Sequence, residues 1–195
     1  GYSYYGSMSD VDKERFGWSV AGNQTSGPAV AANGSAWGYQ GAPEGNQVVS
    51  LQMNASVSQI VELPGAGTYT LSWWDASRGG QVNPYLVTLD GIPLAEAFST
   101  SNPAWQARSV TFQIPDAGTG TLVFAGQTAA TDSSVGIDDV RLTKFVAKGV
   151  RVLYAQRTVE ARELGIFVGA EPDPPYRRIE TRELGLVVAD DAIPA

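Results

Sequence analysis

The chain has 195 residues and a net charge of -7, and 17% of its residues are charged. It contains neither cysteine nor histidine, which excludes disulfides, thiolate or imidazole catalysis, and metal sites built on either side chain. The negative charge argues against a nucleic-acid surface, and no apolar run approaches the roughly 20 residues that cross a membrane. Any metal ion would therefore need oxygen ligands, and any catalysis would depend on carboxylates, Lys or Tyr.

The first 47 residues are rich in small and polar residues, with scattered aromatics. The charged stretch Asp10–Arg15 favours a turn or a single helical turn, and 16–20 predicts the start of a strand. From Gln47 onward, apolar and polar residues alternate with a period of two, which indicates strands with one buried face.

Turns rich in Gly, Pro and Asn separate these alternating segments, and Asp90-Gly91 is typical of a hairpin. The expected strands are 16–20, 47–54, 57–61, 68–74, 84–89, 107–114, 121–125 and 135–142. Short strands at a spacing near ten residues, without a convincing amphipathic helix, predict an all-β fold. We expect an antiparallel jelly-roll β-sandwich over residues 1–146.

The last third of the chain, 147–195, contains a repeat with an offset of 20 residues. The copies are 157–168 and 177–188, and they share seven of twelve residues. The charged positions that both copies share are Arg157, Glu160, Arg162, Glu163, Arg177, Glu180, Arg182 and Glu183. Two such copies are too small to form a core of their own. We interpret 147–195 as an extended β-repeat arm that binds other protein subunits; the alternative is a tail folded back on its own domain.

An ordered set of short segments extends over residues 16–143. The segments are Gly17-Trp18, 45–51, 58–60, 67–73, 87–91, 122–126 and 136–142. In this order they resemble the galactose-binding-like jelly rolls of bacterial carbohydrate-binding modules and secreted surface proteins. The resemblance implies a fold whose members mostly bind glycans, sometimes stabilise a partner and rarely catalyse.

Trp73 and Trp74 are neighbours on one expected strand, so their side chains face opposite ways. Trp73 is in phase with Tyr69 and Leu71, which predicts that it lies in the core and that Trp74 faces outward. An outward Trp can stack on the apolar face of a pyranose. Arg78, Asn83 and Tyr85 follow nearby and could supply polar contacts to the sugar. The alternative is that the Tyr-rich N-terminus or another subunit covers Trp74.

Two more aromatic residues, Trp37 and Trp105, lie in expected loops beside amide side chains. Stacking together with amide hydrogen bonds suits sugar recognition. The same residues suit the anchoring of loops equally well, so both interpretations stay open.

Asp138 and Asp139 lie in the last expected strand. The resemblance implies a structural Ca²⁺ in this region, and adjacent carboxylates with loop carbonyls are ligands that calcium accepts. Successive strand residues point to opposite faces, which opposes convergence of the two carboxylates. The alternative is that Asp138 makes a buried hydrogen bond while Asp139 is solvated.

Glycoside hydrolysis needs two acids that face one cleft at about 5–10 Å. The candidate acids, Glu44, Glu62, Asp75, Glu96 and Asp132, each stand alone in the sequence. We therefore predict a non-catalytic protein of the extracellular space or of a virion surface. Its function is then that of a displayed head that contacts surface glycans, as in a virion decoration or fibre protein, with the arm for assembly. The alternative is a free-standing carbohydrate-binding module of a secreted bacterial protein.

Overall fold

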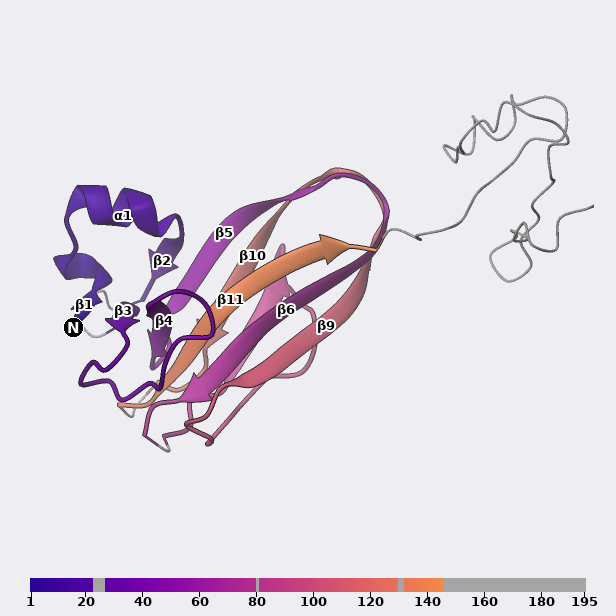
Figure 1. Cartoon of the computed structure of the whole chain (residues 1–195). Helices are drawn as coiled ribbons and strands as arrows, with labels where there is room; N and C mark the ends of the chain where they lie inside the picture. Colours follow the sequence, from indigo (N-terminus) through magenta and orange to yellow (C-terminus); the bar gives the residue numbers. More distant parts are fainter. Residues whose placement is uncertain (23–26, 80, 130–131, 146–195) are drawn as a thin grey trace, which may run out of the picture. The chain divides into compact units, whose positions relative to one another are not determined.

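The computed structural model describes residues 1–22, 27–79, 81–129 and 132–145 (Figure 1). The segment 147–195, with the eight charged positions that its two copies share, lies outside the described residues. None of the helices in the described part is long and apolar enough to cross a bilayer.

Two antiparallel sheets pack face to face. The first sheet has the strand order β1 (Tyr2–Tyr4), β3 (Ala29–Ala32), β4 (Gln47–Gln52), β11 (Ser134–Lys144), β6 (Gly67–Ser77) and β9 (Gln106–Ile114). The second has the order β2 (Ser19–Ala21), β5 (Ser56–Leu63), β10 (Gly118–Gly126), β7 (Tyr85–Leu89) and β8 (Ile92–Pro93). Neighbouring strands that lie far apart in sequence, such as β4 beside β11, give the jelly-roll connectivity. The predicted antiparallel jelly-roll sandwich is thus confirmed for the described residues.

The main core lies between the sheets and follows from the alternation. Tyr69, Leu71 and Trp73 of β6 are fully buried, whereas the intervening residues are partly exposed. The Trp73 ring meets the rings of Phe98 and Phe124 edge-on, at centroid distances of 4.9 and 5.5 Å. Edge-to-face contacts of this kind add to the free energy gained by burial. The inward orientation predicted for Trp73 is therefore confirmed.

The start of the chain differs from the expected strand at 16–20. A helix, α1 (Asp10–Phe16), follows a short 3₁₀ turn, η1 (Tyr5–Ser7), and the strand begins at Ser19. The Ser9 side chain caps the helix by accepting a hydrogen bond from the Asp12 amide at 3.1 Å. Gly17 ends the helix in the left-handed conformation, with φ of 70°. The cap and this glycine assign Phe16 to the helix, which is why the strand starts later.

A second cluster of buried residues lies on the outer face of the first sheet, away from the main core. We call it the outer-face cluster; it comprises Ala29, Ala31, Trp37, Tyr39, Val48 and Ala76, with Tyr4, Ala42 and Trp105 at its margin. Gly136 of β11 lies beneath it, where a Cβ would be 2.8 Å from the Tyr39 ring and 2.9 Å from that of Trp105. The loop after β3 therefore packs directly on the sheet and covers part of its outer face.

Substitution of Leu71 by Ala tests the position of the main core. Leu71 is 0% exposed, so we expect Leu71→Ala to lower the free energy of unfolding by about 2–5 kcal/mol. Ile60, which is 72% exposed, provides the control, because Ile60→Ala is expected to change it by less than about 0.5 kcal/mol. Urea denaturation of both variants measures the difference, and equal losses would contradict the assignment.

Candidate functional site

Trp74 lies on the outer face of β6, where its strand neighbours are Ala107 of β9 and Asp138 of β11. The side chain is partly exposed. Among the described residues, no aromatic ring contacts Trp74, and its indole nitrogen has no hydrogen-bond acceptor. The predicted outward orientation is therefore correct, and part of the Trp74 side chain is exposed on this face.

Trp105 immediately precedes β9 and lies on the same outer face. Its indole nitrogen donates to the Gln40 carbonyl at 2.8 Å, and its ring is tilted against Tyr39 at a centroid distance of 6.0 Å. These contacts hold the ring over Gly136 while part of the side chain stays exposed. Trp105 thus anchors its loop and also presents aromatic surface on the same face as Trp74.

A row of small uncharged side chains continues from the two tryptophans along β6 and β9. It consists of Thr68, Thr70, Ser72, Ser109, Thr111 and Gln113. The Thr70 and Thr111 hydroxyls are 3.2 Å apart, and the Gln113 amide donates to the Thr68 hydroxyl at 2.8 Å. The alternation in 107–114 indicated that these residues face outward, but it did not show that they extend the surface around Trp74.

Trp37, a candidate for stacking on a sugar, is 2% exposed and belongs to the outer-face cluster. Tyr2 and Tyr4 lie against it at centroid distances of 5.5 and 5.8 Å. The Arg78 guanidinium lies 4.6 Å from its centroid and forms an ion pair with Asp132 at 3.4 Å. The Tyr-rich N-terminus therefore covers Trp37 rather than Trp74. Trp37 and Arg78 hold loops against the sheet, and the burial of Trp37 makes its ring unavailable for the stacking expected of it.

Asn83 and Tyr85, expected to make polar contacts with a sugar, are 1% and 0% exposed. The Asn83 amide donates to the Leu51 and Met53 carbonyls at 3.0 and 2.9 Å, which joins the loop before β7 to β4. Tyr85 lies in the main core, where burial raises the pKa of its hydroxyl above the ordinary value of 10.0. Proximity to Trp74 in sequence was misleading, because both side chains turn inward and serve the fold.

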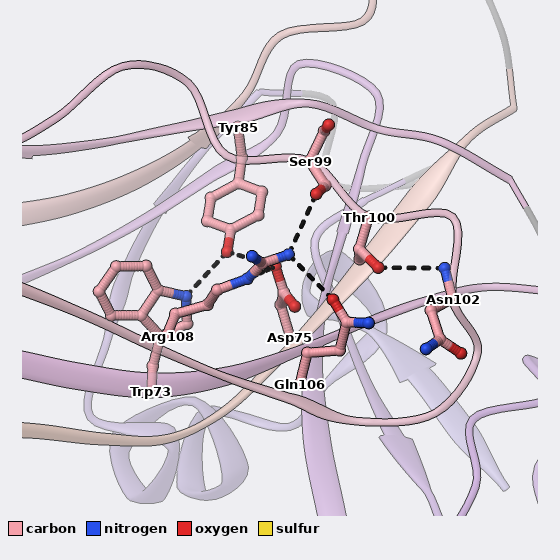
Figure 2. A network of polar contacts seen from close by, with 8 residues as sticks. All are labelled: Trp73, Asp75, Tyr85, Ser99, Thr100, Asn102, Gln106 and Arg108. Carbon is pink, nitrogen blue, oxygen red and sulfur yellow. Dashed lines mark hydrogen bonds and ion pairs between the residues drawn. The ribbon is translucent and has the colours of Figure 1, made fainter.

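The Tyr85 hydroxyl belongs to a buried polar network between the sheets (Figure 2). It accepts a hydrogen bond from the Trp73 indole at 2.8 Å and donates to Asp75 Oδ2 at 2.8 Å. Arg108 Nε contacts the same Asp75 oxygen at 2.9 Å. The Arg108 Nη2 group donates to the Ser99 carbonyl and to the Gln106 side chain, at 3.1 and 3.2 Å.

This network also reaches the loop between β8 and β9 that ends at Trp105. Arg108 ties the segment at Ser99 to β9, and the Asn102 amide donates to the Thr100 hydroxyl at 3.0 Å within the same loop. The middle of the loop between β8 and β9 is thereby held, shortly before Trp105, whose own ring contacts Gln40 and Tyr39.

Asp138 and Asp139 lie at a bulge of β11. The pairing with β6 shifts register between Asp138 and Arg141, and Asp139 has a φ of 49°. The bulge breaks the alternation that would separate the carboxylates, and both line one hollow of about 450 Å³. Trp18, Val57, Phe124 and Ile137 contribute apolar surface to this hollow, and Glu44 and Arg141 contribute charge.

The residues of this hollow do not fit a calcium ion in the observed arrangement. Asp138 Oδ2 accepts a hydrogen bond from the Glu44 amide at 2.9 Å, and Asp139 Oδ1 pairs with Arg141 Nε at 2.7 Å. Within the described ranges, no group of three or more acidic side chains is placed to hold a metal. Calcium requires several oxygen ligands that converge on the ion, whereas here the Asp139 carboxylate is paired with Arg141.

Comparison with solved structures finds carbohydrate-binding modules, the class that the sequence resembles. A family 35 module from Clostridium thermocellum has a TM-score of 0.49 and 12% identity, over 66% of this chain and 92% of that one. TmCBM61, solved with β-1,4-galactotriose, has a TM-score of 0.42 and 20% identity, over 66% of this chain and 88% of that one. CBM36, solved with calcium and xylotriose, has a TM-score of 0.47 and 13% identity, over 64% of this chain and 92% of that one. No protein-family model and no curated protein matches the chain. At such identities, the ligands of those proteins do not transfer to this one.

The pH dependence of stability tests the environment of Asp138. Burial raises the pKa of its carboxyl above 3.8, and the charges of Glu44 and Asp139 act in the same direction. Protonated Asp138 therefore stabilises the fold below the pKa of the unfolded carboxyl, and this contribution is lost as pH rises through the folded pKa. We expect Asp138→Asn to raise the thermal midpoint at neutral pH and to leave it unchanged in acid.

Asp139→Asn is the matched control, because it removes the ion pair with Arg141 and should not raise the midpoint. Melting curves at neutral and acidic pH, each with calcium or with chelator, provide the measurement. Calcium that stabilises the parent but not Asp138→Asn would contradict the assignment of this hollow as unsuited to the ion.

Proposed function

We propose that the jelly roll is a non-catalytic domain that binds glycans on the outer face of β6 and β9, with Trp74 as the main contact. The observation that carries the proposal is a partly exposed indole without a ring or hydrogen-bond partner in the described structure. A flat indole stacks on the apolar C–H face of a pyranose, as aromatic residues do on other apolar surfaces. Trp105, held on the same face by Tyr39 and Gln40, supplies a second such surface.

The polar surroundings of Trp74 favour a neutral sugar. The outward residues of β6 and β9 are hydroxyl, amide or small side chains, which donate and accept hydrogen bonds without charge. Charged groups, Asp138 and Arg141, lie on the neighbouring strand β11. A few precisely placed polar groups beside an apolar contact are typical of binding sites for small ligands.

The positions of the acidic residues support a binding role rather than hydrolysis. Asp75, the acid next to Trp74 in sequence, faces the interior and is paired with Arg108. Asp132 is engaged by Arg78 and by the Gln52 amide. A glycosidase needs two carboxyl groups that flank the bond to be cleaved, about 5–10 Å apart. Asp138, beside Trp74, has its partners in the hollow of β11 instead.

Replacement of Trp74 tests the proposal directly. We expect Trp74→Ala to lower affinity for a neutral oligosaccharide at least about tenfold, because the stacking surface is removed. Its thermal midpoint should stay near that of the parent, because the side chain packs on no other ring. A glycan array identifies the sugar, and calorimetry measures affinity.

Ile92, which is 69% exposed on β8 of the second sheet, provides the control. Ile92→Ala removes an exposed apolar side chain away from β6 and β9 and should bind like the parent. Equal affinities of Trp74→Ala and the parent would remove Trp74 from the site, and a parent that binds no glycan would refute the function.

We further infer that residues 147–195 join this domain to other protein subunits at a virion surface, as in a decoration or fibre protein. The 20-residue repeat favours this role, because a free-standing carbohydrate-binding module of a secreted bacterial protein does not need it. Its paired Glu and Arg positions suit contacts between neighbouring segments.

A truncated chain ending near Lys148 tests the assembly arm. Residues Gly1–Phe145 form one compact unit with their own core, so the truncated chain should fold. Light scattering after size exclusion should give a larger assembly for the full chain than for the truncated one. Equal subunit numbers would refute the arm and favour the free-standing module.

A further inference from the structure

β9 is a long strand at the edge of the first sheet, beyond β6 (Figure 1). All nine of its residues pair with β6 in one continuous register, from Gly67 opposite Ile114 to Asp75 opposite Gln106. The other edge strands of the described structure are shorter: β1 and β2 have three residues each, and β8 has two and ends at Pro93. β9 therefore offers the longest regular edge of the sandwich.

This edge lacks the usual protection against pairing with another chain. Natural edge strands are blunted by prolines, lysines, bulges or covering loops. β9 contains no proline or lysine and has no bulge, and in the described structure its backbone bonds to no segment other than β6. Its one charged residue, Arg108, directs its guanidinium to Asp75 and Ser99. An unpaired row of amides and carbonyls of this length is a template for one more strand.

We propose that β9 pairs antiparallel with β9 of a second copy of this chain, about a two-fold axis at Val110. This register pairs all nine residues. On the outer face, Ser109 lies opposite the partner's Thr111, and Ala107 lies opposite the partner's Gln113. On the inner face, Arg108 lies opposite the partner's Phe112, so that no two like charges meet. The strand is thus complementary to itself.

The dimer joins the two outer faces into one continuous surface, because the two-fold axis runs perpendicular to the sheet. The two Trp74 side chains then lie on the same face, about 25 Å apart for regular strand spacing and rise. A long glycan could contact both, and such bivalent contact raises affinity without any new interaction within either copy. This last consequence rests on the proposed glycan site, whereas the dimer itself does not.

Two double variants with the same substituted positions test the pairing. S109K/T111K places Lys opposite Lys across the two-fold axis, whereas S109K/T111E places Lys opposite Glu. Ser109 and Thr111 are both exposed, so each variant should fold, and thermal melting checks this. We use the full chain and the chain ending near Lys148, so that assembly through 147–195 is separated from pairing through β9.

Sedimentation and light scattering of the truncated parent should show a dimer with a dissociation constant on the order of micromolar, as expected for a small interface. S109K/T111K should be monomeric, and S109K/T111E should be dimeric. A monomeric truncated parent throughout the micromolar range, or a dimeric S109K/T111K, would overturn the proposal.

Glycan measurements then separate the two proposals. S109K/T111K and S109K/T111E change the same two surface positions, so they are compared with each other. The ratio of affinity for a long polysaccharide to affinity for a short oligosaccharide should be at least about tenfold lower for monomeric S109K/T111K than for dimeric S109K/T111E. If the dimer is lost without any change in binding to the polysaccharide, the pairing through β9 stands, but its proposed effect on glycan affinity is refuted. Absence of glycan binding by every form would refute the glycan site alone.

Discussion

The buried carboxylate of Asp75 is the constraint on which the rest of this sandwich depends. It lies at 0% exposure between two sheets, where an unpaired charge would strongly destabilise the fold. The chain satisfies Oδ2 with the Tyr85 hydroxyl from β7 and the Arg108 guanidinium from β9. Trp73 extends the same network through its indole nitrogen. Two strands of one sheet and one of the other are therefore joined by polar contacts with defined geometry, in addition to apolar packing.

The consequence for function is that the same contacts determine which side chains of β6 point inward and which point outward. Once Trp73 and Asp75 are held in the interior, Trp74 must point outward, since side chains alternate along a strand. The same Arg108 holds the loop that carries Trp105. The two tryptophans on the outer surface thus belong to segments whose inward-facing side chains are held by this network.

The outer-face cluster determines how much of the first sheet stays available. Tyr39 packs on Gly136, and its hydroxyl lies 2.8 Å from that of Ser50, where burial raises its pKa above the ordinary value of 10.0. Trp37 packs against Tyr2, Tyr4 and Arg78 and covers the same region of the sheet. Aromatic side chains from the chain itself therefore occupy the outer surface over β3 and β4. Open surface remains over β6 and β9, where Trp74 and the uncharged row lie.

The sequence by itself determined the fold class and the two faces of β6, because a period of two is a local property that survives any arrangement of strands. It also limited the chemistry, since a chain without Cys and His has few catalytic or metal-binding side chains. The sequence could not show that the side chains of Asn83, Tyr85 and Trp37 are buried, because their burial depends on which distant segments cover them. The convergence of Asp138 and Asp139 was likewise hidden, because it results from a bulge that only strand pairing creates. Tertiary structure alone decided these points, because a partner far away in sequence leaves no periodic signal near the residue that it covers.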